Sequence, residues 1–144
     1  MLLGAAAVGL AGAGAPAQDV SVAVSGLRNA RGQVRACLTA QPAAFPDCAK
    51  DPASRRLSVP ATGAVRLDFG PVPPGRYAIS LFHDENSNGK LDTVLMIPRE
   101  GFGFSRDAKV RFGPPSFDAA AFAVDGAPVR QEIRVRYLMG TAQH

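Results

Sequence analysis

The sequence predicts an all-β protein: a single antiparallel β-sandwich of about seven strands with one long loop rich in Gly and Phe. Three observations carry this prediction. Apolar and polar residues alternate with a period of two along several short stretches, as in a strand with one buried face. Gly and Pro together account for 27 of the 144 residues, which favours short elements joined by turns. No stretch shows the periodicity of a long helix.

Clear alternation assigns strands to residues 19–27, 33–40, 64–70, 76–83 and 128–138. This pattern gives each sheet one wet face, which favours antiparallel pairing over a parallel sheet covered on both faces. The side chains predicted to be buried between the sheets are Val22, Val24, Val34, Leu38, Leu67, Ile79, Leu81, Ile133 and Val135. On the opposite parity of the second strand, Arg35, Cys37 and Thr39 are expected to point outward. A helical turn is expected only in residues 52–57 or 118–122.

Residues 1–17 form an uncharged stretch of mostly Ala, Gly and Leu that predicts a signal peptide. It ends in Ala15-Pro16-Ala17, a pattern that signal peptidase cleaves, and it is too short and weakly apolar to span a membrane. No Lys or Arg precedes it, which also fits a signal that begins upstream of Met1. The alternative is a disordered tail. We therefore expect an exported protein, periplasmic or extracellular, with one domain over residues 18–144 and no membrane span after signal removal.

Cys37 and Cys48 support the same location, because two cysteines in an exported domain usually form a disulfide. Closing a loop of this size stabilises a fold by about 3 kcal/mol on the chain-entropy argument. The alternative is a pair of free thiols in a cytosolic protein.

The basic residues indicate no nucleic-acid partner. The formal net charge is +4, but the arginines are scattered along the chain. Arg130, Arg134 and Arg136 share one parity of the last predicted strand, where a solvated strand face is the favoured interpretation. We expect an unidentified protein or a small ligand as the partner.

Four blocks of sequence, taken in order, resemble one bacterial family: SGLRNARGQVR, PPGRYAISLFHDENSNGKLDT, IPREGFGFS and RFGPPSFDAAAF. The chain is identified as a member of a family of exported domains of unknown function (family twenty-one forty-one), over nearly all of residues 19–138. The PPGRY motif at residues 73–77 also resembles prealbumin-like and collagen-adhesin B-type sandwiches. These resemblances imply a prealbumin- or immunoglobulin-like β-sandwich and export, but no activity. The sequence departs from the family pattern at Val94 and in its cysteines.

The stretch FHDENSNGKLDT, residues 82–93, predicts a calcium-binding loop. Oxygen donors recur at alternate positions from Asp84, and Gly89 stands where an EF-hand-type loop turns sharply. The expected ligands are Asp84, Asn86, Asn88, the carbonyl of Lys90, and Asp92. Leu95 replaces the usual bidentate Glu, so the expected affinity is weak, about 0.1–1 mM. The alternative is an ordinary turn, because Asp, Asn, Ser and Gly are also favoured in turns.

The segment Leu95–Phe117 is a second candidate site, because connections longer than about 15 residues are uncommon and often functional. In the favoured interpretation its Phe side chains anchor the loop to the domain. In the other they line a ligand pocket together with charged neighbours. The residues concerned are Arg99, Glu100, Phe102, Phe104, Arg106, Phe112 and Phe117.

His83 shares the inward parity of the strand before the Asp-rich loop, so a packing role or support of the loop is favoured. No motif supplies a nucleophile, a catalytic residue or a phosphate-binding loop. The sequence thus predicts a non-enzymatic exported module with a binding or structural role. The alternative is a periplasmic enzyme that uses His83 and the carboxylates of Asp84, Glu85 and Asp92 beside the 95–117 loop.

Overall fold

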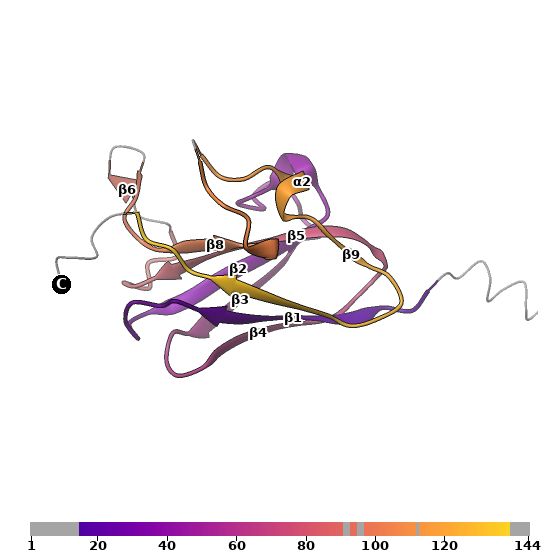
Figure 1. The fold of residues 1–144 in the computed structure, drawn as a ribbon, viewed down its shortest axis with the longest axis horizontal. Coiled ribbons are helices and arrows are strands. Elements are labelled where there is room, and N and C mark those ends of the chain that lie inside the picture. The colour runs from indigo at the N-terminus through magenta and orange to yellow at the C-terminus, as the bar shows by residue number, and fades with distance from the viewer. Residues whose placement is uncertain (1–14, 91–92, 95–96, 112, 139–144) are drawn as a thin grey trace, which may run out of the picture.

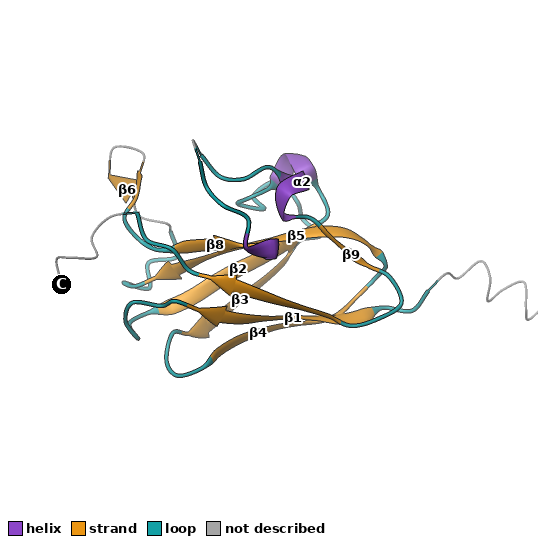
Figure 2. Ribbon diagram, in the orientation of Figure 1, coloured by secondary structure: helices purple, strands orange, loops and turns teal. Residues whose placement is uncertain are grey.

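The computed structural model describes residues 15–90, 93–94, 97–111 and 113–138, and β-strands dominate it (Figures 1 and 2). The smaller main sheet has the order β10 (Val129–Arg134), β1 (Gln18–Ser25), β4 (Val65–Val72). The larger has the order β3 (Arg55–Pro60), β2 (Gln33–Thr39), β5 (Gly75–Asp84), β8 (Phe102–Phe104), and β9 (Phe122–Val124) also pairs with β5. A short hairpin joins β6 (Thr93–Val94) to β7 (Ile97–Pro98). The helical turns are η1 (Pro42–Ala44), η2 (Ser105–Asp107) and α2 (Phe117–Ala120).

Both main sheets contribute to one hydrophobic core, as the alternating sequence predicts. Every side chain predicted to lie in the core is buried except Val24, which is partly buried. The core includes Val20, Val22, Val34, Leu38, Leu67, Phe69, Ile79, Leu81, Ile133 and Val135. Among the residues described, no helix is long and apolar enough to cross a membrane.

The prediction of purely antiparallel sheets is wrong at one strand pair. β1 pairs with β4 antiparallel but with β10 parallel, with Val20 opposite Val129 and Val24 opposite Ile133. Alternation reports which face of a strand is buried, and that face is the same for either direction of the neighbour. A parallel pair needs a long crossover, and nearly the whole domain supplies it here, because β1 and β10 are the first and last strands.

The outer face of the larger sheet, turned away from the core, is partly covered. Cys37 and Thr39 point to this face as predicted, yet both are buried. In Figure 1, α2 and the segment after β2 lie together on this side of β5 and β8. They enclose a second apolar cluster of Ala78, Phe102, Phe104, Phe117, Ala120 and Ala121, with Phe45 packed against it. The sequence predicts that this face is solvated, but at one end of it the side chains form a small apolar core.

Local sequence decides the helical turns only in part. Residues 117–120 form the expected turn, and the side chain of Ser116 caps it by accepting a hydrogen bond from the amide of Ala119 at 3.1 Å. In the other candidate, residues 52–57, the last three residues instead begin β3. There Leu57 and Val59 pack against the main core while Arg56 and Ser58 face out. Pairing with β2 therefore overrides the weak local preference.

Cys37 and Cys48 form a disulfide, as predicted, and both cysteines are buried. It ties the middle of β2 to the segment that follows η1. We expect the Cys37→Ser, Cys48→Ser double variant to lose about 3 kcal/mol of unfolding free energy, because the unfolded chain regains the entropy of the open loop. Urea denaturation measures the loss.

Reductant provides the control for this prediction. It should lower the stability of the wild-type protein by a similar amount and leave the double variant unchanged. Equal stability of variant and wild type, or thiols that alkylate readily without reductant, would contradict it.

Candidate functional site

The turn after β5 is organised by the carboxylate of Asp84, which is fully buried. Its Oδ2 accepts hydrogen bonds from Arg35 Nε at 2.6 Å and from the amide of Gly89 at 2.8 Å. Its Oδ1 accepts from the amide of Asn88 at 3.1 Å. Burial raises the pKa of Asp84, but these hydrogen bonds and the charge of Arg35 outweigh it and hold the pKa below its ordinary value.

The predicted calcium ligands form the contacts of a turn. Asn86 Oδ1 accepts from the amide of Asn88, and Asn88 Oδ1 accepts from the amide of Lys90. Asp92 lies outside the described residues. In the described part of the chain, no three acidic, His or Cys side chains gather as metal ligands. As placed, Asp84 does not fit calcium, because a cation on Oδ2 would stand beside the Arg35 guanidinium. Calcium binding stays a prediction of the sequence.

Glu85 ties the β1–β2 connection to the end of β5. Its carboxylate accepts hydrogen bonds from Arg28 at 2.7 Å, Asn29 at 2.9 Å and Arg31 at 3.2 Å. Burial opposes ionisation, yet the bonds from Asn29 and Arg28 lower the pKa of Glu85 overall. Gly32 sits so close that a Cβ on it would lie 1.9 Å from the carbonyl oxygen of Asp84. Only glycine fits this contact.

His83 is fully buried beside this network, and both of its ring nitrogens have partners. Nε2 lies 2.7 Å from the carbonyl oxygen of Arg31, which can only accept, so Nε2 carries a proton. Nδ1 lies 2.8 Å from the hydroxyl of Tyr137, which itself accepts from the amide of Arg28 at 3.0 Å. In a neutral ring, Nδ1 accepts from that hydroxyl. These contacts join three separate parts of the chain.

The long segment, predicted to be a loop, includes the strand β8. Gly101-Phe102-Gly103-Phe104 alternates as a strand does, but its small residues face inward. A Cβ on Gly103 would lie 2.5 Å from Ile133, and one on Gly101 2.4 Å from Val135. The glycines let the smaller sheet approach, and the phenylalanines face outward. Alternation of Gly with Phe was the available signal for β8.

The other candidate residues of this segment are dispersed. The carbonyl of Arg99 accepts a hydrogen bond from the side chain of Arg28 at 3.2 Å. The carboxylate of Glu100 accepts a hydrogen bond from the amide of Glu85 at 2.8 Å. The amide of Arg106 donates to Gln131 at 2.7 Å. Phe117 packs edge-on against Phe45. Phe112 lies outside the described residues. Phe102 and Phe104 are buried and also line a cavity, so anchoring and lining are not exclusive.

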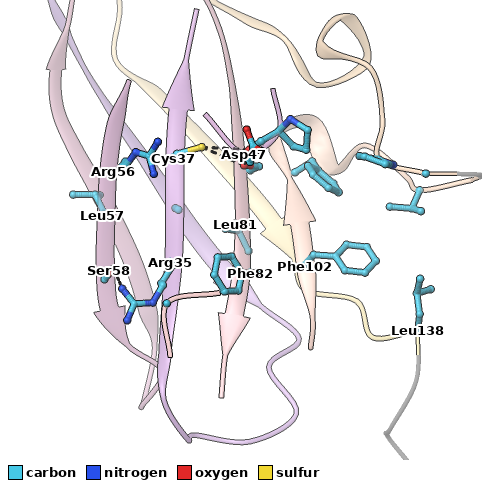
Figure 3. A pocket seen from close by; sticks show the side chains of 18 of the residues that line it. Arg35, Cys37, Asp47, Arg56, Leu57, Ser58, Leu81, Phe82, Phe102 and Leu138 are labelled. Atoms are coloured by element: carbon cyan, nitrogen blue, oxygen red, sulfur yellow. Dashed lines mark hydrogen bonds between the residues drawn. The ribbon is translucent and has the colours of Figure 1, made fainter. Parts of the chain in front are cut away.

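That cavity, of about 940 Å³, lies on the outer face of the larger sheet. Strand register sets its floor as two rows that cross the sheet from β3 to β8. The first row is Ser58, Arg35, Phe82, Phe102, and the second is Arg56, Cys37, Ser80, Phe104. Figure 3 shows Arg35, Phe82 and Phe102 following one another across the strands, with Leu138 beyond them. We call this hollow the sheet cavity.

The walls of the sheet cavity come from segments far apart in sequence. Pro46 and Asp47 belong to the disulfide-closed loop, and the side chain of Ser80 on the floor donates to the carbonyl of Pro46. Val110, Arg111, Gly113 and Pro114 belong to the segment between η2 and α2, and Gly89 to the turn after β5. Leu138, a large hydrophobic side chain, also lines the cavity and is 54% exposed.

Arg35, Arg56 and Arg111 are the basic residues of the lining, and Asp47 is its acidic residue. The sequence analysis missed this site because its residues lie on four strands and several loops. Outward parity was correctly predicted for Arg35 and Cys37, but which side chains stand beside them depends on register between strands. Register between distant strands cannot be read from parity alone.

The fold and the cavity define a mostly β domain of two main sheets with a hollow on the outer face of the larger sheet. By sequence, the chain belongs to the bacterial family described as "Uncharacterized protein conserved in bacteria (DUF2141)", whose model matches residues 22–132. This confirms the predicted family. No curated protein and no solved structure matches the chain. The likeness to prealbumin-like sandwiches stays a prediction.

Asp84→Asn should lower the unfolding free energy by about 2 kcal/mol at pH 7, because it removes the buried charge that pairs with Arg35. The folded-state pKa of Asp84 is lowered, so its contribution is present above the unfolded pKa of about 3.9 and is lost as pH falls through the folded pKa. Urea denaturation at pH 7 and at successively lower pH should show the difference between variant and wild type shrinking.

Asp68→Asn is the matched control, because Asp68 also caps a glycine amide, at 3.0 Å, but is exposed and has no ion pair among the described residues. Its effect should stay near 0.5 kcal/mol. The same assay separates turn from ion site. A turn gives an equal Asp84→Asn loss in millimolar calcium and in chelator, whereas a calcium ligand gives a larger loss with calcium.

Proposed function

We propose that this chain is an exported, non-enzymatic binding module, a β-sandwich of the prealbumin-like class, that binds a small ligand in the sheet cavity. The observation that carries the proposal is the cavity itself. Its volume of about 940 Å³ falls within the range of small-molecule sites, and apolar side chains with a few polar groups line it, as is usual for such sites.

Covalent and hydrogen-bonded links support a preformed site. The disulfide ties the wall containing Pro46 to β2, and Ser80 bonds the same wall to β5. A preformed cavity avoids the entropy cost of ordering its walls on binding. Leu138 leaves apolar surface exposed at this cavity, and a bound apolar group would remove that surface from water.

The disulfide and the uncharged leader both support export. The sandwich is supported by the core that both main sheets share. The enzymatic alternative depends on His83, which is buried, bonded through both ring nitrogens, and not part of the cavity lining. We assign His83 the role of joining the β1–β2 connection to the C-terminal segment.

Blocking the cavity tests the proposal. Ser58 is exposed on β3 and faces the cavity, so Ser58→Trp should fill part of it without disturbing the core. N-phenyl-1-naphthylamine, a neutral apolar dye that fluoresces when bound, serves as the probe. We expect dye binding to the wild-type protein and roughly tenfold weaker binding to Ser58→Trp, because the indole displaces apolar contact area.

Ala23→Trp is the matched control, since Ala23 is an exposed strand residue of the smaller sheet and lies outside the cavity lining. It should leave dye binding unchanged. Equal loss in both variants, or no dye binding by the wild-type protein, would contradict the proposal.

A further inference from the structure

We infer that the ligand of the sheet cavity is a small anionic amphiphile, with one acidic head group and an apolar body. The inference deepens the proposed function and depends on it. Its basis is the order of side chains along the two rows of the floor. In each row an arginine stands on β3 or β2 and a phenylalanine on β8. The floor is therefore basic at one end and aromatic at the other.

The arginines of the lining have charge to offer an acid. Arg56 and Arg111 form no ion pair with any residue in the described part of the chain. Arg56 donates to the carbonyl of Cys48 at 2.8 Å, which holds its side chain near the disulfide. Arg111 is exposed and makes no hydrogen bond with the described residues. Arginine is well suited to carboxylate and phosphate groups, because its planar fork donates two parallel hydrogen bonds.

The other charges leave the lining as a whole net positive. The charge of Arg35 is offset by the buried carboxylate of Asp84. Asp47 is the acidic residue of the lining, and its charge offsets that of one further arginine. Its Oδ1 accepts a hydrogen bond from the amide of Ala49. One of the arginine charges of the lining therefore remains without compensation. This surplus favours an anion over a neutral or cationic head group.

The aromatic end suits the body of such a molecule. Phe82 and Phe102 are cross-strand neighbours on β5 and β8, and Leu138 lies beyond them. Strands lie about 4.8 Å apart, so the row from β3 to β8 spans about 14 Å. An extended acyl chain laid across the strands would place its apolar carbons on Phe82 and Phe102 and its acid on the side of β2 and β3, where Arg56 stands.

Three ligands with one tail and different heads test the inference: octanoate, octan-1-ol and octyltrimethylammonium, each kept below its aggregation concentration. Titration of the full folded protein, followed by backbone amide shifts in ¹H–¹⁵N NMR, gives both affinity and location. We expect octanoate to bind about fivefold more tightly than octanol, and the cation most weakly, with shifts concentrated in β2, β5 and β8. The octanoate advantage should shrink as salt rises.

Charge variants assign the advantage to residues. Arg111→Gln, which breaks no described contact, should weaken octanoate binding severalfold and leave octanol binding unchanged. Arg56→Gln should do the same, and Arg56→Lys should restore part of the loss because it keeps the charge. Arg130→Gln removes an equal charge from the smaller sheet and serves as the control.

The outcomes separate the two proposals. If all three ligands bind equally well in the cavity, or if Arg130→Gln matters as much as Arg111→Gln, the inference is overturned and the proposed function stands. If none shifts the cavity residues and the neutral dye also fails to bind, both are overturned.

Discussion

Strand β5 is the constraint on which the rest of the structure depends. It pairs with β2 along one edge and with β8 and β9 along the other, so both of its edges carry partner strands. Its inward side chains, including Ile79 and Leu81, enter the main core. Its outward side chains divide by position: Ala78 lies under the second apolar cluster, whereas Ser80 and Phe82 form the floor of the sheet cavity. Strand β5 thus contributes to the main core, to the second apolar cluster, and to the floor of the sheet cavity.

The polar end of β5 gathers the loops that would otherwise be free. His83, Asp84 and Glu85 are consecutive. His83 bonds the β1–β2 connection and Tyr137, Asp84 bonds Arg35 and the following turn, and Glu85 bonds Arg28 and its neighbours in the β1–β2 connection. His83 and Asp84 are fully buried, so each unmade hydrogen bond there would cost about 1–3 kcal/mol. That cost explains why oxygen-rich residues follow this strand.

The sequence predicts well what depends on local pattern, and less well what depends on contact between distant segments. Alternation located β1, β2, β4, β5 and β10, but not β3, and it identified all of the expected core except Val24, because burial of one face is a local property. It missed β8, where Gly101 and Gly103 face inward and carry no apolar signal. It also predicted a solvated Thr39, although the segment that follows Cys48 brings Asp51 within 2.6 Å of its hydroxyl. The cavity could not be predicted from the sequence for the same reason, because it forms only when strand register and loop placement are set.

The arginines of the cavity differ in how far a ligand can recruit them. Arg35 holds Asp84 with Nε and Ser58 with Nη1, and the pairing contributes to folding stability. A ligand that drew Arg35 away would leave the buried carboxylate of Asp84 uncompensated, which is costly. Arg35 therefore acts as a fixed, largely neutralised part of the floor beside Phe82. Arg56 and Arg111 form no ion pair with the described residues, so an acidic head group gains the most binding energy from these two arginines. Selectivity for charge would then reside on β3 and the segment before α2, while selectivity for the apolar body resides on β5 and β8.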